Sequence, residues 1–229
     1  MISTARLRLA DPREVADLGA FLGRLLRFDR AAAVRLQATP AGDAGVLAVF
    51  GRLPLGASGV LALRTARLAP AADAVDLTVS AGQLLEGLDE EQGTVVLPPP
   101  VTGPAWAGLL PPRAGWRLLG ETGADLVVPQ LMAAVGEFKE RTAQVPEHHR
   151  TRDQLDAIAD EIWSRPLPAL PALPLRAAHA AYRIGFLHPG APLSAHRAGS
   201  WLRLTAPHGT VLLRTAAAPG AGLGLTPVG

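Results

Sequence analysis

The sequence predicts an α+β fold. An N-terminal mixed or antiparallel sheet with packed helices is expected first, followed by a smaller helical, winged-helix-like C-terminal module. Short apolar runs at residues 46–50 and 60–64, bounded by glycine and proline, are typical of strands inside a sheet. Apolar residues at helical spacing within residues 12–28 indicate an amphipathic helix. Two helical segments and a two-stranded ribbon within residues 151–214 indicate the second module.

The N-terminal half alternates between strands and helices. Asp11 can cap a helix, Pro12 suits its first turn, and Glu14 stands three residues after the cap. The apolar face of this helix consists of Val15, Leu18, Leu22, Leu25 and Leu26. Ser80 and Gln83 form a second capping box, which opens a short helix. Strands are expected at residues 5–9, 33–38, 46–50, 60–64, 75–79 and 94–97.

Residues 98–123 are rich in proline and glycine and contain Trp106 and Trp116. Such a tract can be a stiff linker or the ligand of a partner protein. Its tryptophan and leucine content is too apolar for a free linker, so we expect an irregular segment that covers the N-terminal sheet. A helix is expected at residues 125–144, and we place the end of an N-terminal domain, residues 1–145, after it.

The C-terminal block, residues 146–215, is expected to form a helix–helix–hairpin module. Thr151 and Gln154 form a capping box at the start of its first helix. Four prolines at residues 165–174 exclude a long regular helix there.

A second helix at residues 175–186 and a hairpin at residues 201–214 complete this module. In a winged helix, the second helix enters the major groove and the hairpin lies against the phosphate backbone. Residues 216–229 are an Ala/Gly/Pro-rich tail.

Basic residues of this block are the candidate contact site for a macromolecule. Arg176, His179 and Arg183 follow each other at steps of three and four residues, which places them on one face of a helix. Arg203 and Arg214 lie on the predicted hairpin. Arginine suits phosphate contacts because its planar fork binds two oxygens and stays charged. The alternative is that both helices and the hairpin simply cap the N-terminal sheet.

Composition limits the choice of partner and compartment. The net charge is +2 and the sequence pI is about 9.9, because arginine supplies nearly all positive charge and Lys139 is the one lysine. A balanced charge is not typical of a strongly basic nucleic-acid binder, and a GC-rich bacterial genome also favours arginine. The chain has no cysteine, no signal-peptide pattern and no apolar run of membrane-spanning length. We therefore expect a soluble cytoplasmic protein without membrane contact.

No motif in the sequence identifies a reaction. His148 and His149 beside Glu147 form the one metal-like cluster, but adjacent side chains cannot both face one ion from a helix. Lys139 is not preceded by a glycine loop, so it is not part of a phosphate-binding loop. We therefore assign no catalytic residue, no metal ligand and no cofactor.

Three classes of function follow. The leading hypothesis is a non-enzymatic regulatory or assembly protein that binds a protein or nucleic acid through its basic C-terminal helix and hairpin. The second is an enzyme or sensor that binds a small anionic ligand at the N-terminal sheet. The third is a homo-oligomeric scaffold that pairs exposed strand edges.

Overall fold

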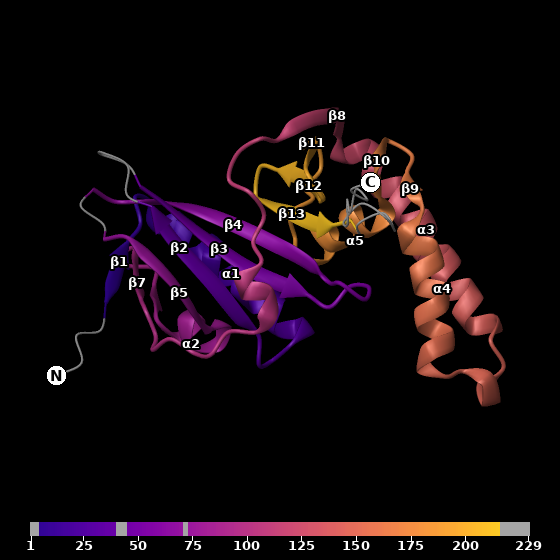
Figure 1. The fold of residues 1–229 in the computed structure, drawn as a ribbon, viewed down its shortest axis with the longest axis horizontal. Coiled ribbons are helices and arrows are strands. Elements are labelled where there is room, and N and C mark those ends of the chain that lie inside the picture. The colour runs from indigo at the N-terminus through magenta and orange to yellow at the C-terminus, as the bar shows by residue number, and fades with distance from the viewer. Residues whose placement is uncertain (1–4, 40–44, 71–72, 216–229) are drawn as a thin grey trace, which may run out of the picture.

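The computed structural model describes residues 5–39, 45–70 and 73–215, and its central feature is a large antiparallel sheet (Figure 1). Within these residues the sheet has eight strands in the order β5-β2-β3-β4-β13-β12-β11-β8, and we call it the main sheet. Its strands from the N-terminal half are β2 (Ala33–Thr39), β3 (Gly45–Leu53), β4 (Val60–Leu68) and β5 (Val75–Ser80). Its strands from the C-terminal half are β8 (Arg117–Gly123), β11 (Pro192–Ala198), β12 (Trp201–Ala206) and β13 (Gly209–Arg214).

The two halves of the main sheet meet where β4 pairs with β13. The paired residues are Thr210 with Leu63, Val211 with Ala62, and Leu212 with Leu61. Leu61 and Leu212 belong to one apolar cluster, whereas Ala62 and Val211 belong to another. Because successive strand residues point to opposite faces, the main sheet is covered on both sides at this junction. We call the side that packs against α1 and α5 the helical face and the other side the outer face.

Helix α1 (Pro12–Phe28) covers the N-terminal half of the helical face. The Asp11 carboxylate accepts a 2.9 Å hydrogen bond from the backbone N–H of Arg13, and Pro12 opens the helix. The buried stripe consists of Val15, Leu18, Phe21, Leu22 and Leu25. Ser80 caps the short helix α2 (Ala81–Glu86) in the same way, through the N–H of Gln83. A small sheet beside these helices contains β1 (Arg6–Arg8), β7 (Thr94–Val96) and β6 (Leu88–Asp89).

Two long helices form an arm that extends away from the main sheet (Figure 1). They are α3 (Ala124–Gln144) and α4 (Arg152–Ser164), which are joined through the short 3-10 helix η2 (Glu147–His149). Glu161 of α4 accepts hydrogen bonds of 2.6 Å from Arg141 of α3 and 2.7 Å from Arg165. These two bonds lower the pKa of Glu161 to about 2, with that from Arg141 as the larger cause.

Helix α5 (Leu175–Arg183) covers the C-terminal half of the helical face. It follows a short hairpin of β9 (Pro166–Leu167) and β10 (Leu170–Pro174). This hairpin is the structure that the proline-rich residues 165–174 adopt. Its buried residues are Leu175, Ala177, Ala178, Ala180 and Ala181. The small side chains of the four alanines allow close packing on β12 and β13. The helix ends before Gly185, which has a φ of +79° as expected of a helix-terminating glycine.

The outer face is crossed by residues 98–116, which we call the covering segment (Figure 1). This segment contains the 3-10 helix η1 (Ala105–Gly108) and is otherwise irregular. Its apolar side chains Trp106, Leu110 and Trp116 pack against a second core cluster of Phe50, Leu61, Trp201 and Leu212. The apolar runs in β3 and β4 therefore reflect strands that are covered on both faces around Phe50 and Leu61, whereas Val46 is 44% exposed.

The α+β class is confirmed, but the winged-helix-like C-terminal module is not, because the C-terminal region is largely strands. The hairpin predicted at residues 201–214 is present as β12 and β13, yet it lies inside the main sheet instead of standing beside a helix as a wing. Leu202 and Leu204 pack in the core on the helical face, and Trp201 and Leu212 belong to the second core cluster on the outer face, so each face of the hairpin is at least partly covered.

The expected domain boundary after residue 145 stays a prediction. Strand β8 precedes that position and pairs along its length with β11, which follows it. The tail expected at residues 216–229 lies outside the described residues. In the part of the chain that the structure describes, no helix combines the length and apolar character needed to cross a bilayer.

Candidate functional site

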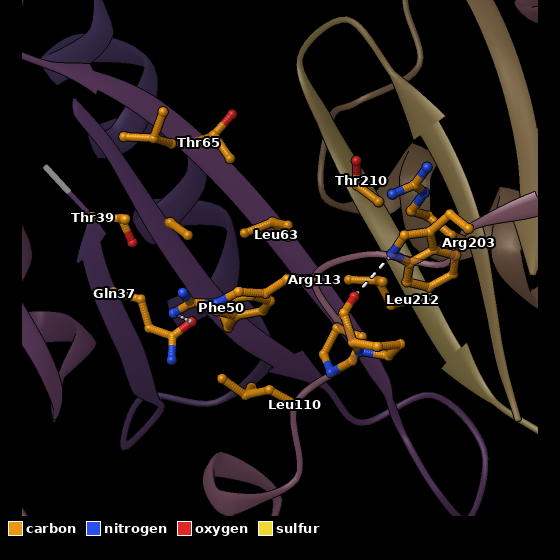
Figure 2. A pocket seen from close by; sticks show the side chains of 15 residues that line it. Gln37, Thr39, Phe50, Leu63, Thr65, Leu110, Arg113, Arg203, Thr210 and Leu212 are labelled. Atoms are coloured by element: carbon orange, nitrogen blue, oxygen red, sulfur yellow. Dashed lines mark hydrogen bonds between the residues drawn. The ribbon is translucent and has the colours of Figure 1, made fainter. Parts of the chain in front are cut away.

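A groove of about 480 Å³ lies on the outer face, between the main sheet and the covering segment (Figure 2). Its floor is apolar and is formed by Ala48, Phe50, Leu63 and Leu212. One wall belongs to the covering segment, with Leu110, Pro111, Pro112 and Trp116. Its polar side chains are Gln37, Thr39, Thr65, Arg113, Arg203 and Thr210. An apolar cavity of this size with a few polar groups is the usual form of a small-molecule site.

Strand register brings these floor and polar residues together from distant parts of the chain. Phe50 lies opposite Leu63, which lies opposite Thr210, so three strands contribute one row across the sheet. In the next row, Leu212 lies opposite Arg203. Because directly opposed residues share a face, every one of these side chains points to the outer face. The groove therefore depends on pairing between the N-terminal and C-terminal halves of the main sheet.

Arg203 is the most unusual residue of the groove. Its guanidinium carbon lies 4.3 Å from the centroid of the Trp116 ring, which is a cation–π contact. Among the described residues, its Nε atom is buried without a hydrogen-bond partner, and its guanidinium group takes part in no ion pair. Burial lowers the pKa of this guanidinium from its ordinary value. Arg203 is thus a partly desolvated cation that an aromatic ring alone accompanies.

Two other half-buried arginines have carboxylate partners. Arg64, whose side chain is 12% exposed, pairs with Asp17. Arg176, whose side chain is 19% exposed, pairs with Asp160 at 2.6 Å. Arg203 shares the absence of a carboxylate partner with Arg24 and Arg52 among the half-buried arginines described, but it is the one of these three that lines the groove and lies against an aromatic ring.

Arg113 supplies a second guanidinium group on the opposite side of the groove (Figure 2). It donates a 3.4 Å hydrogen bond to the side-chain oxygen of Gln37. The Gln37 amide in turn donates to Asp76 at 3.4 Å, and Arg35 neutralises Asp76 through a 2.8 Å ion pair. Arg113 therefore approaches a neutral amide, and among the described residues that line the groove none is acidic.

Polar groups continue beyond Arg203 along the outer face of β11 and β12. His196 lies opposite Arg203, and burial, followed by the Arg203 charge, lowers its pKa. The His196 Nδ1 and Thr205 Oγ1 atoms are buried, and no described residue gives them a hydrogen-bond partner. Thr205 also lines a neighbouring cavity of about 400 Å³ together with Glu121 and Ser194.

The basic residues predicted from the sequence lie on two sides of the main sheet. Arg203 and Arg214 point to the outer face, where Trp201 belongs to the second core cluster. Arg203 is two residues after Trp201 on β12, and Arg214 of β13 lies directly opposite Trp201. Arg176, His179 and Arg183 belong to α5, which packs on the helical face. The main sheet therefore separates these two groups, and the four guanidinium groups do not share one surface.

The three α5 residues also have partners within the protein. Arg176 pairs with Asp160, and the Arg183 guanidinium lies 5.0 Å from the Phe28 ring centroid. His179 stacks on Trp163 at a centroid distance of 4.1 Å. Burial, with smaller contributions from the Arg183 and Arg176 charges, lowers the pKa of His179 to about 4. Whether any of these residues contacts a macromolecule stays a prediction.

Gln37, Phe50 and Arg113 were not recognised in the sequence as candidates. The available signal was the continuous apolar character of residues 46–50 and 60–64, because strands that are apolar on both faces need a cover on both. The sequence contains no indication of which polar residues would line the gap under that cover. In the described part of the chain, no group of three or more His, Asp or Glu side chains is arranged to hold a metal ion.

Fold and site together define a class: an α+β protein with a ligand-sized groove on one face of a continuous antiparallel sheet. Residues 2–108 match the model of a family described as "Domain of unknown function (DUF8010)". Residues 111–218 match a second family described as "Domain of unknown function (DUF8185)". The first range contains β2 to β5 and the second contains β8 and β11 to β13, so each supplies one half of the main sheet. A search of curated proteins found no match.

Proposed function

We propose that this protein acts by binding and not by catalysis, and that the groove on its outer face holds a small ligand with an anionic group. Arg203 is the observation that supports this proposal most. Arg203 is half-buried, and removing part of a charged group from water costs free energy unless a partner offsets the loss. A cation–π contact contributes only about 0.5–2 kcal/mol. An anion bound beside Arg203 would provide the missing charge-assisted hydrogen bonds.

The shape of the groove favours a small ligand that is largely apolar. Its floor of Phe50, Leu63 and Leu212 offers an apolar surface, and a few hydrogen-bonding side chains surround these residues. Small-molecule sites commonly combine an apolar lining with a few polar groups that orient the ligand. An amphiphilic acid has both parts, with a carboxylate for Arg203 and an apolar body for the floor.

A protein or nucleic acid bound through the C-terminal basic residues is the second proposal, and it has less support. Arg176 has a carboxylate partner within the protein, and Arg183 packs on an aromatic ring. Since α5 and the β12–β13 hairpin present their arginines on different faces, one flat partner cannot contact all four. The phosphate contacts that would make such binding strong therefore could not act together.

The proposal can be tested with decanoate and its neutral counterpart decanol in thermal-shift and calorimetric titrations. We expect decanoate to raise the melting temperature and to bind more tightly than decanol, because the carboxylate reaches Arg203. Arg203→Gln should remove this difference. Arg152→Gln is the matched control, because the Arg152 side chain is 93% exposed and outside the groove. Equal binding of both compounds, or unchanged binding of decanoate by Arg203→Gln, would refute the proposal.

A further inference from the structure

The groove has a guanidinium group at each side. Figure 2 shows the Arg113 guanidinium beside Gln37, and that of Arg203 near Thr210 on the other side of the floor. Arg113 extends from the covering segment, whereas Arg203 extends from β12, so two independent parts of the chain supply the two charges. Ala48, Phe50, Leu63 and Leu212 form the apolar surface between them.

We infer that the ligand of this groove is a long-chain dicarboxylic acid, with one carboxylate at Arg203 and the other at Arg113. The inference rests on the proposed function and specifies its ligand. A monoanion at Arg203 would leave Arg113, which is an exposed residue, with water and the amide oxygen of Gln37 as its partners. Two carboxylates would provide each guanidinium group with a charged acceptor, and the apolar chain between them would cover the floor.

Strand spacing sets the length that the ligand must span. Gln37 lies on β2 and Arg203 on β12, and the order β2-β3-β4-β13-β12 places four inter-strand steps between them. At about 4.8 Å per step, the two backbones are about 19 Å apart. Both arginine side chains shorten the gap that the diacid has to span.

Carboxylate suits these two sites better than phosphate. A phosphate group carries a charge of about −1.5 to −2 at neutral pH, whereas a carboxylate carries one. Each site offers one guanidinium group, and the floor between them is apolar. Beside half-buried Arg203, the excess charge of a phosphate would therefore be partly desolvated without a partner.

The test compares alkanedioic acids of increasing length with the alkanoic acids of the same length, by isothermal titration of the full chain. At the optimal length we expect the diacid to bind about five- to ten-fold more tightly than the monoacid, as for one additional hydrogen bond of ordinary net strength, because Arg113 is exposed to water. Short diacids should show no such advantage. Arg113→Gln should lower the affinity of the diacid to that of the monoacid, while Arg203→Gln should weaken both acids.

The outcomes separate this inference from the proposed function. Monoacid binding that depends on Arg203, without a diacid advantage at any length, would overturn the diacid and keep the proposed function. Equal weakening of both acids by Arg113→Gln would likewise overturn the diacid and keep the proposed function. If neither acid binds, the proposed function fails and the diacid fails with it. Circular dichroism of both variants, with Arg152→Gln as the control, shows whether a loss of binding reflects a loss of fold.

Discussion

The guanidinium carbon of Arg203 and the ring centroid of Trp116 lie 4.3 Å apart, and this contact connects β12 to the end of the covering segment. The Trp116 indole N–H donates a 2.9 Å hydrogen bond to the carbonyl oxygen of Pro112, which holds the ring in place. The contact thus fixes one wall of the groove through a cation that has no carboxylate partner among the described residues. A contact that lowers the stability of the folded protein while it shapes a cavity is typical of binding sites.

Replacing Arg203 with methionine should leave the ligand-free protein as stable as before or stabilise it by about 1 kcal/mol. The variant loses a cation–π contact but no longer desolvates an unpaired charge. Chemical denaturation measures the change in the free energy of unfolding. Arg64→Met is the contrasting variant and should destabilise, because it removes the partner of Asp17. Destabilisation by Arg203→Met comparable to that of Arg64→Met would show that Arg203 is a structural residue.

Gly51→Ala should destabilise the protein by about 1–3 kcal/mol, which is the usual cost of overpacking a core. A Cβ atom at residue 51 would lie 2.6 Å from Cδ2 of Leu25, a fully buried residue of α1. Gly136→Ala in α3 is the matched control, because its Cβ would have nothing within 4 Å. That substitution should stabilise by about 0.5–1 kcal/mol, since alanine favours helix. Similar unfolding midpoints for both variants would contradict the close packing of α1 on β3.

The stability of the protein should depend on the ionisation of His179 between about pH 6.5 and pH 4. Its folded-state pKa of about 4 is lower than the ordinary value of 6.5, so in this range the unfolded state binds a proton that the folded state does not. The contribution is therefore complete above pH 6.5 and is lost as the pH falls, by roughly 3 kcal/mol at most.

His179→Phe keeps a ring against Trp163 and removes this titration. Denaturation curves at several pH values should show a smaller loss of stability on acidification for the variant than for the wild type. Because the other carboxylates and histidines are common to both proteins, the difference between the two curves isolates His179. Parallel curves would mean that His179 ionises as freely in the folded protein as in the unfolded chain.

Random duplex DNA tests the macromolecule proposal directly. We expect no gel shift with micromolar protein at low salt, because Arg203 and Arg214 lie on the face of the main sheet opposite to Arg176 and Arg183. A shift that disappears at raised salt would instead indicate phosphate contacts. The substitution Arg183→Gln would then show whether α5 carries that binding.

Local features of the chain were predictable from the sequence. The caps at Asp11, Ser80 and Thr151 depend on side chains that bond to backbone groups two or three residues away, so their signals are contiguous. The apolar stripe of α1 follows from helical periodicity in the same way. By contrast, the four prolines at residues 165–174 predict only that no long helix forms there. They do not predict the hairpin that this tract adopts.

The sequence by itself determined the α+β class, because capping and apolar periodicity act over a few residues. It also predicted that the strands at residues 46–50 and 60–64 are central in a sheet, since both are short apolar runs. Only the tertiary structure decided that β13 pairs with β4 and that Arg203 and Arg113 border one groove. Strand pairing joins residues more than a hundred positions apart, and its register, which no local pattern encodes, decides which side chains share a face.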